Sequence, residues 1–237
     1  MGTKLIVLAN SWKRKDYCIA GIEPETGNWV RPVSDLHDGR ITKAHIQLRG
    51  YFPKLLDVIE IPLAKGGPDF GFERENRSIL PGDWHLVATA TAAHLLRYSE
   101  SPRTALHNDR KYVTIAELQS KPKSDRKTLQ LLHVNDFQTT RTEVEGRRQW
   151  CGVFSSAGKQ LQLRITDPIY CERLNTGHQA VRSCLLTISL GMPFVPPNWP
   201  AHESPPCWKL IAGIIELPPE NYWKRLTRHA RTIISRR

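Results

Sequence analysis

Residues 8–34 read LANSWKRKDYCIAGIEPETGNWVRPVS, and this stretch decides the fold. With the apolar residues before it, it predicts a strand over residues 4–9, a polar and basic loop, and a second strand over residues 17–22. Thr26-Gly27-Asn28 has the chemistry of a tight turn, and the segment WVRPVS that follows reads as a third strand. Because Pro32 has no N–H to donate, we expect the third strand to lie at a sheet edge or to end there.

The rest of the chain continues in the same style. Further strands are expected where short apolar runs are bounded by turn residues, at residues 55–63, 150–155, 160–165, 183–190 and 208–217. Helical patterns are few, and we expect one short helix over residues 91–98 and another opened by a capping-box pattern at Thr114. The sequence therefore predicts a mostly β protein with a few short helices.

An internal repeat suggests two similar halves. Ile19-Ala20-Gly21-Ile22 recurs as Ile211-Ala212-Gly213-Ile214, which favours two small β-barrels in tandem. The polar segment KPKSDRK at residues 121–127 carries a proline and no apolar period, as is typical of a linker. We therefore expect a first barrel with short helices over residues 1–120 and a second barrel over residues 128–237.

The tail after Pro219 differs from both halves. Pro219 suits the first turn of a helix, and apolar residues from Tyr222 to Ile234 recur on one face, so we expect a C-terminal amphipathic basic helix. Its apolar face either packs on the second barrel or leaves the helix to lie on a phosphate backbone, an acidic partner or an anionic membrane surface. The cations that would make secondary contacts are Lys224, Arg225, Arg228 and Arg231.

The charge balance favours a polyanionic partner. The 237-residue chain has 34 Lys and Arg against 23 Asp and Glu, a formal net charge of +11. Neutralising phosphates with such cations releases counterions, and this is the main sequence-independent contribution to nucleic-acid affinity. An acidic protein partner, or solubility alone, is the alternative explanation of the charge.

Cysteine spacing and hydropathy indicate the cellular compartment in which the protein works. Five cysteines are widely spaced with no close pair, which predicts reduced thiols in a cytoplasmic protein and no structural zinc site. No apolar run approaches the length of a membrane span, and the first ten residues read as a strand rather than a signal peptide. We therefore expect no membrane partner.

The candidate nucleic-acid site is the basic loop after the first strand. Three consecutive cations project a positive field, and a tryptophan beside them offers a face on which a base can stack. The small polar residues before it can hydrogen-bond phosphate, sugar or a base edge. With two residues of the neighbouring strand, the predicted binding residues are Asn10, Ser11, Trp12, Lys13, Arg14, Lys15, Trp29 and Arg31. The alternative is a solvated loop with Trp12 folded onto the core.

Catalytic motifs are missing from the sequence. It contains no nucleophile elbow, no phosphate-binding P-loop, no zinc-protease motif and no dinucleotide fingerprint. This favours a binding protein over an enzyme, and we predict no catalytic residues, no metal and no cofactor. Two alternatives stay open: a metal-dependent nuclease with carboxylates from distant strands, and an interaction subunit that binds an acidic partner.

The opening stretch resembles the start of the dual OB-containing domain family of bacterial proteins. The resemblance is carried by Asn10-Ser11, the cations from Lys13 to Lys15, Cys18-Ile19-Ala20-Gly21 and the segment from Gly27 to Val33, and later by the strand from Trp208 to Gly213. It implies two OB-like barrels in tandem and a nucleic-acid-handling role. It also implies a component of a bacterial defence or mobile-element system, within a larger protein or ribonucleoprotein complex. RNA and DNA both remain possible ligands.

Overall fold

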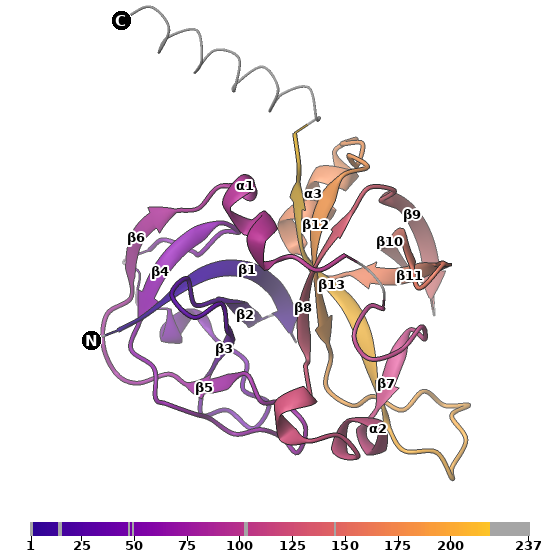
Figure 1. The fold of residues 1–237 in the computed structure, drawn as a ribbon, viewed down its shortest axis with the longest axis horizontal. Helices are drawn as coiled ribbons and strands as arrows, with labels where there is room; N and C mark the ends of the chain where they lie inside the picture. The colour runs from indigo at the N-terminus through magenta and orange to yellow at the C-terminus, as the bar shows by residue number, and fades with distance from the viewer. Residues whose placement is uncertain are drawn as a thin grey trace, which may run out of the picture.

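Two β-sheets lie side by side and make up the body of the protein (Figure 1). The computed structural model describes residues 2–13, 16–46, 48, 50–101, 104–144 and 146–218, and of Lys13 and Arg147 it describes the backbone only. The predicted C-terminal helix, with Lys224, Arg225, Arg228 and Arg231, lies outside the described residues.

The first sheet is a closed barrel in the N-terminal part of the chain. Its strands follow the order β5-β3-β2-β1-β4-β6. Beyond β4 the chain continues alongside β5, where Leu63 pairs with Ile79 and the Ala64 N–H donates to the Ser78 carbonyl at 2.9 Å, and this closes the barrel. The strands are β1 (Thr3–Lys13), β2 (Asp16–Ile22), β3 (Trp29–Val33), β4 (Asp57–Ile61), β5 (Asn76–Ser78) and β6 (His85–Thr89).

The second sheet contains the remaining strands. They follow the order β8-β12-β13-β11-β10-β9, and the short β7 pairs with β13. Every residue of β12 is buried, because this strand lies between β8 and β13 and against the first barrel. The strands are β7 (Tyr112–Thr114), β8 (Leu129–Val134), β9 (Gln138–Val144), β10 (Arg147–Ser156), β11 (Lys159–Ile165), β12 (Cys184–Leu190) and β13 (Pro206–Glu216).

Helices are few and short, as predicted. The predicted helix start at Thr114 is confirmed, because its hydroxyl accepts a hydrogen bond from the Glu117 N–H at 3.2 Å at the start of α2. The Glu117 side chain does not complete a capping box and accepts from Asn108 at 2.9 Å instead. One helix, α3, was not predicted, although the N-cap Asp167 and the proline after it are signals of a helix start. The helices are η1 (Lys43–His45), α1 (Ala92–Leu95), η2 (Leu96–Tyr98), α2 (Ile115–Gln119), η3 (Lys123–Asp125) and α3 (Pro168–Asn175).

The expected strands are present, and the mostly β fold with two OB-like halves is confirmed. One local prediction is wrong: Asn10, Ser11 and Trp12 belong to a strand and not to a loop. β1 pairs with β2 as far as Lys13 opposite Asp16, because the antiparallel ladder continues through the polar residues. The predicted linker at residues 121–127 carries η3, and the division of the chain into domains at this segment stays a prediction.

The two sheets meet where β1 crosses β13, a contact that we call the barrel seam. A register shift between Val7 and Ala9 takes the Leu8 carbonyl out of the β1–β2 ladder, and the Thr187 hydroxyl of β12 donates to it at 2.6 Å. A β-carbon added at Gly213 would lie 2.1 Å from the same oxygen. The strands can approach this closely only because Gly213 has no side chain.

The repeated sequence motif lies at this seam. Ala20 of the first copy and Ala212 of the second belong to one small buried cluster, together with Ala9 and Leu129. The repeat therefore marks the surfaces through which the two halves pack, where small residues let the backbones come close.

The partly buried carboxylate of Glu216 connects β13 to α3 and to the segment after it. Glu216 accepts hydrogen bonds from Tyr170 at 2.9 Å, from the His178 ring at 2.6 Å and from Arg173 at 2.8 Å. Burial raises the pKa of this carboxyl, but the three hydrogen bonds outweigh it and the pKa of Glu216 is lowered. The ionised form is therefore stabilised in the folded state.

We expect this arrangement to make stability sensitive to acid. A lowered carboxyl pKa stabilises the fold fully above the usual value of 4.5, and this contribution is lost as the pH falls through the lowered value. In urea unfolding at a series of pH values, Glu216→Gln should be less stable than the wild type near neutrality and lose less stability on acidification. Glu172→Gln, an exposed glutamate of the same helix, is the control and should follow the wild type. Equal pH dependence in wild type and Glu216→Gln would contradict the assignment.

Candidate nucleic-acid interface

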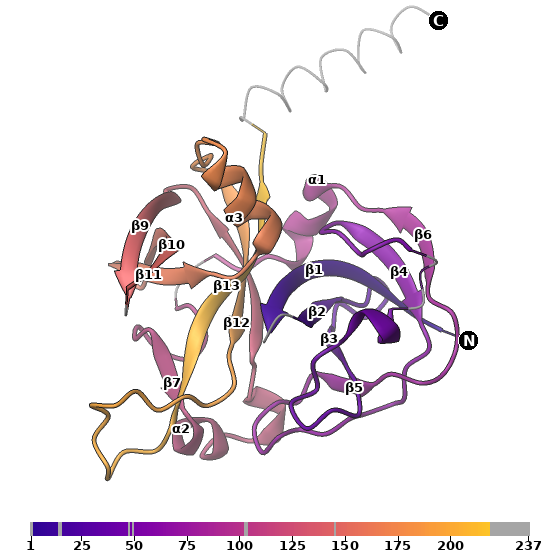
Figure 2. The same cartoon turned by 180° about the vertical axis from the view of Figure 1, so that it is seen from behind.

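The β1–β2 hairpin displays an exposed tryptophan. Trp12 is 58% exposed and lies directly opposite Tyr17 across the ladder, two residues along from the pair formed by Asn10 and Ile19. Residues directly opposite each other share a face of a sheet, so Trp12, Tyr17 and Asn10 lie on one side of the hairpin. Figure 2 shows the end of β1 beside α3, and the backbone N–H of Trp12 donates to the backbone carbonyl of Thr166 at 3.4 Å.

Two further rings, Tyr51 and Phe52, come from the loop before β4 and extend this face. Phe52 stacks on Tyr17 with centroids 5.5 Å apart and ring planes at 26°. The Lys43 ammonium lies 5.7 Å from the Phe52 centroid, and the Lys54 ammonium lies 5.5 Å from that of Tyr51. We call the set Trp12, Tyr17, Tyr51, Phe52, Lys43 and Lys54 the aromatic–lysine surface.

Hydrogen bonds fix the loop that carries Tyr51 and Phe52. The Asn10 side-chain amide donates to the Pro53 carbonyl at 2.5 Å, which fixes the loop against the hairpin. The Asp57 carboxylate accepts from the Tyr51 hydroxyl at 2.8 Å and from the Lys54 N–H at 2.7 Å. The rings are therefore held in place before any ligand arrives.

The local charges leave the two lysines free for a ligand. Arg40 pairs with Asp16 at 2.9 Å, and His45 lies 3.6 Å from Asp35. Within the described part of the chain, neither Lys43 nor Lys54 has a carboxylate within ion-pair distance. Both are exposed, and an ammonium above a ring can turn to a phosphate while the ring stacks a base.

The structure places the other predicted binding residues in several environments. Asn10 and Ser11 are buried, and Trp29 is half-buried against the apolar clusters of the barrel seam. Lys13 ends β1, and Arg14 and Lys15 lie outside the described residues, so the role of these cations stays a prediction. Of the predicted aromatic side chains, Trp12 is the one that the structure brings to the surface.

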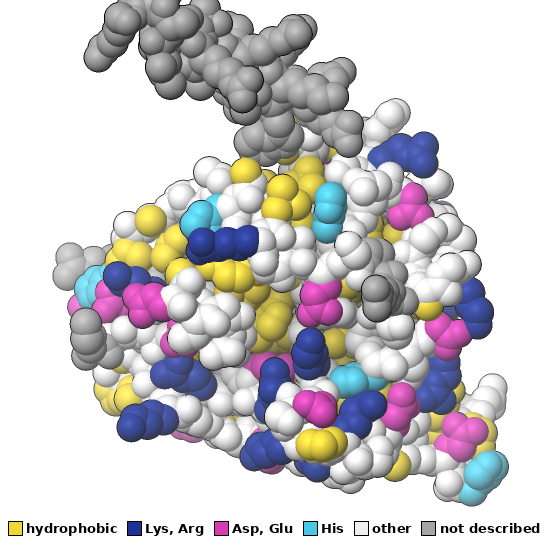
Figure 3. Space-filling model, in the orientation of Figure 1, with side chains coloured by type: hydrophobic (Ala, Val, Ile, Leu, Met, Phe, Trp, Pro, Cys, Tyr) yellow, Lys and Arg dark blue, Asp and Glu magenta, His cyan; other side chains and the backbone are white. Residues whose placement is uncertain are grey.

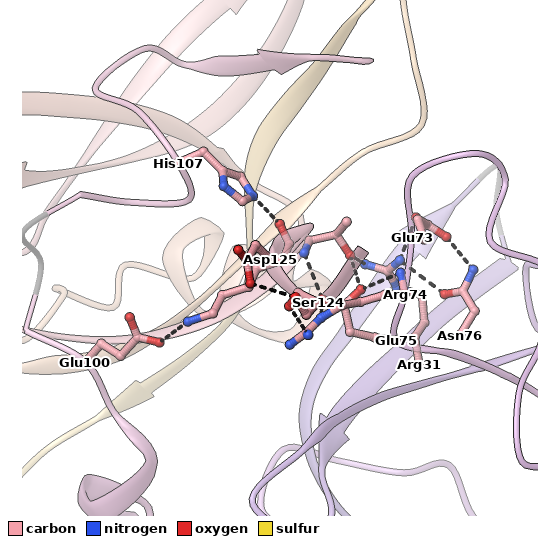
Figure 4. Close-up of polar contacts among 11 residues, drawn as sticks. Arg31, Glu73, Arg74, Glu75, Asn76, Glu100, His107, Ser124 and Asp125 are labelled. Carbon is pink, nitrogen blue, oxygen red and sulfur yellow. Dashed lines mark hydrogen bonds and ion pairs between the residues drawn. The ribbon is translucent and has the colours of Figure 1, made fainter. Parts of the chain in front are cut away.

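Arg31 lies in the interior, and its predicted place on an exposed cationic surface is wrong. It is 4% exposed, and one guanidinium nitrogen lies 2.5 Å from Glu73. The other nitrogen donates to the hydroxyls of Thr128 at 3.2 Å and Ser189 at 3.4 Å in the second half. Figure 4 shows Arg31 beside Glu73 and Glu75. Burial disfavours the cation, but Glu73 and Glu75 outweigh it and the pKa of Arg31 is raised. Arg31 ties the two halves together instead of facing a ligand.

A further polar contact strengthens the same junction. The N–H and the hydroxyl of Thr128 donate to the two oxygens of Glu75, at 2.8 and 2.9 Å. Arg74 donates to the Ser124 carbonyl, and Lys123 pairs with Asp69 at 3.1 Å. The predicted linker is therefore held to the loop before β5 through Lys123 and Ser124, and Figure 4 labels Arg74 and Ser124.

Sequence reasoning missed most of the aromatic–lysine surface. The available signal was the segment from Lys43 to Lys54, where cations surround the adjacent rings Tyr51 and Phe52. A smaller group of the same kind lies in the second half, where Arg141 lies 5.1 Å above the ring of Trp150 and both donate to Asn175.

The described residues offer neither a metal-ligating cluster nor a membrane-spanning helix. Among the described residues, no three His, Cys, Asp or Glu side chains are grouped so that they could hold a metal ion. The helices within the described ranges are all too short or too polar to cross a bilayer. The five cysteines are free, and burial raises the pKa of Cys184 and of Cys207 to about 12 each.

Comparison with known families decides the classification. The model of the dual OB-containing domain matches residues 3–214, which is most of the chain. The protein belongs to the dual OB-containing domain family. This membership confirms the resemblance seen in the opening stretch and the tandem OB-like halves. OB folds commonly bind oligonucleotides across a strand face and the loop between their first two strands, and in this dual OB-containing domain that loop is the tip of the β1–β2 hairpin.

Other comparisons add little to the description of this dual OB-containing domain. No curated protein matches the sequence. The crystal structure of the p204 HINb domain is similar with a TM-score of 0.32 and 10% sequence identity, over 89% of this chain and 91% of that one. At that score the likeness bears on neither the fold nor the function of the present protein.

Proposed function

We propose that this protein binds single-stranded nucleic acid, RNA or DNA with weak sequence preference, along the aromatic–lysine surface. The observation that carries the proposal is the stacked pair Tyr17–Phe52 with Lys43 above it, on the hairpin face that also presents Trp12. Bases would stack on the exposed rings, and Lys43 and Lys54 would contact the phosphates. A single strand is favoured because its base faces are free to stack, whereas those of a duplex are already stacked.

The proposal extends to the finer predictions drawn from the resemblance. The protein would act in the cytoplasm as a non-catalytic component of a bacterial defence or mobile-element system, within a larger protein or ribonucleoprotein complex. This context is the one that the resemblance of the opening stretch implies, and the free cysteines agree with a reducing compartment. The metal-dependent nuclease and the subunit with an acidic protein partner stay alternative predictions.

Removing one ring should weaken binding measurably. Phe52→Ala deletes one base platform, and stacking is worth about 1–3 kcal/mol per base, so we expect about a tenfold rise in the Kd for a fluorescent single-stranded oligonucleotide. Lys43→Ala should instead lower the slope of log Kd against log salt by about 1, as loss of one phosphate contact does. Fluorescence anisotropy at two salt concentrations measures both effects.

The matched control is Phe194→Ala. Phe194 is 63% exposed, but it lies on the proline-rich segment of the second half, away from the hairpin. An unchanged Kd in Phe52→Ala, or equal losses in Phe52→Ala and Phe194→Ala, would contradict the proposed surface. Incubating the labelled strand with Mg²⁺ or Mn²⁺ tests the nuclease alternative, which predicts cleavage that depends on an Asp or Glu.

A further inference from the structure

A pocket far along the chain from the aromatic–lysine surface has the features of a ligand site. It has a volume of about 600 Å³ and lies between the turn at Leu106-His107 and the segment from Ser120 to Lys127. This volume falls within the usual range of small-molecule sites. His107 and Asp125, both labelled in Figure 4, are among the residues that line it. We call it the His107 pocket.

The turn that forms one wall has an uncommon backbone. Leu106 and His107 have φ values of 41° and 64°, a left-handed region that non-glycine side chains rarely adopt. Consecutive residues of this kind persist only where the surroundings hold them, and they gather at functional sites. The Leu106 N–H donates to the side chain of Gln130 at 2.8 Å, and Gln130 is 7% exposed.

A buried lysine holds the other end of the same turn. Lys209 is 2% exposed, and its ammonium donates to the backbone carbonyl of Asn108 at 2.7 Å and to the side-chain oxygen of Asn108 at 2.9 Å. Burial lowers the pKa of Lys209 to about 7. The side chains of Gln130 and Lys209, whose burial costs free energy, thus hold the turn in its uncommon conformation. In this conformation the His107 ring nitrogen Nε2 lies 2.7 Å from the Lys127 carbonyl at the pocket wall.

The charges around the pocket favour an anion. Lys121, Lys127 and Asp125 line it, and among the described residues Lys121 has no carboxylate within ion-pair distance. The Lys127 ammonium is 3.5 Å from Glu100, a long ion pair that a stronger anion can replace. In Figure 3, Lys and Arg side chains are spread over the lower half of this face of the molecule, with acidic ones among them.

We propose that the His107 pocket binds a phosphate group, with His107 and Lys121 as its recognition residues. The phosphate could come from a mononucleotide or from the 5′ end of a strand. The proposal does not rest on the proposed function, because the pocket and the aromatic–lysine surface share no residue. Burial lowers the pKa of His107, and Lys121 and Lys209 lower it further, while the Lys127 carbonyl and Glu117 raise it. A phosphate dianion beside the ring would favour the imidazolium and reverse that shift.

The test is an NMR titration of the His107 ring in the full-length protein. The probes are inorganic phosphate, adenosine monophosphate, adenosine, and a single-stranded oligonucleotide with or without a 5′-phosphate. We expect a saturable rise in the His107 pKa with phosphate and adenosine monophosphate but not with adenosine. A response to the oligonucleotide only when it carries the 5′-phosphate would identify a strand end as the source, and a response to the free nucleotide alone would identify a mononucleotide.

Variants make the test specific. Lys121→Ala should weaken phosphate binding about tenfold. Lys159→Ala, which removes an exposed lysine paired with Asp109 outside the pocket, should not change it. His107→Asn keeps a residue that tolerates the left-handed backbone. Because this variant has no His107 ring to titrate, its phosphate binding is measured by isothermal titration calorimetry beside the wild type, and we expect it to be lost while thermal unfolding stays close to that of the wild type. No change in the His107 pKa, an equal response to adenosine, or unchanged affinity in Lys121→Ala would overturn the proposal. Phe52→Ala separates the two sites, because it should leave the phosphate response intact.

Discussion

Replacing Arg31 with methionine should destabilise the protein by about 3–5 kcal/mol, because the change leaves the buried carboxylate of Glu73 without its counter-charge. The substitution also removes the donors to Thr128 and Ser189, so the two halves lose a direct link. Methionine roughly fills the volume of the arginine stem, which confines the loss mainly to charge and hydrogen bonds. Urea unfolding at neutral pH measures the change.

A surface ion pair supplies the comparison. Arg110 pairs with Glu117 but is much more exposed, so Arg110→Met should cost no more than about 1 kcal/mol. In the double variant Arg31→Met/Glu73→Gln, part of the lost stability should return because the lone buried charge is gone. If Arg31→Met costs no more than Arg110→Met, the buried pair does not stabilise the junction as described.

Substituting Gly213 by alanine should have an effect of comparable size. The added β-carbon would lie 2.1 Å from the Leu8 carbonyl oxygen, a contact that can be relieved only by moving β13 away from β1. Separating these strands also opens the hydrogen bond from Thr187 to the same oxygen. We expect a loss of about 3 kcal/mol or more, or a protein that fails to accumulate in soluble form.

The control is a glycine in open space. A β-carbon at Gly66 meets nothing within 4 Å, and its backbone is not left-handed, so Gly66→Ala should be neutral or slightly stabilising. Thermal unfolding of both variants gives the comparison. A Gly213→Ala protein with the unfolding temperature of the wild type would show that the seam is looser than its geometry indicates.

Much of the fold could be predicted from the sequence, because its signals are local. Short apolar runs between turn residues gave the strands, Thr114 gave the cap of α2, and the repeated Ile-Ala-Gly-Ile motif pointed to paired halves. Where the hairpin loop begins was predicted wrongly. Polar residues such as Asn10 and Ser11 resemble a loop in one dimension, yet the ladder with β2 continues through them.

The candidate site was harder to predict, because it depends on contacts between distant residues. Arg31 reads as a surface cation until Glu73, far along the chain, lies beside it in the interior. In the sequence Tyr17 is recognisable only as a strand residue, and its role in the candidate site depends on the stacking of Phe52 on its ring, which the sequence does not reveal. Composition predicts cations and rings on one surface, but only the folded chain decides which of them meet there and which, like Arg31, are paired in the interior.

The hydrogen bond from Thr187 to Leu8 spans 179 residues and has a consequence for synthesis. When the N-terminal half leaves the ribosome, the released Leu8 carbonyl and the apolar residues around it have no cover, since β12 and β13 are still to be translated. Contacts of such long sequence separation form late and slowly. The surface of the first barrel that packs against β12 and β13 therefore stays exposed during synthesis. Exposed apolar surface of this kind favours aggregation, so we expect the yield of folded protein to depend on chaperones.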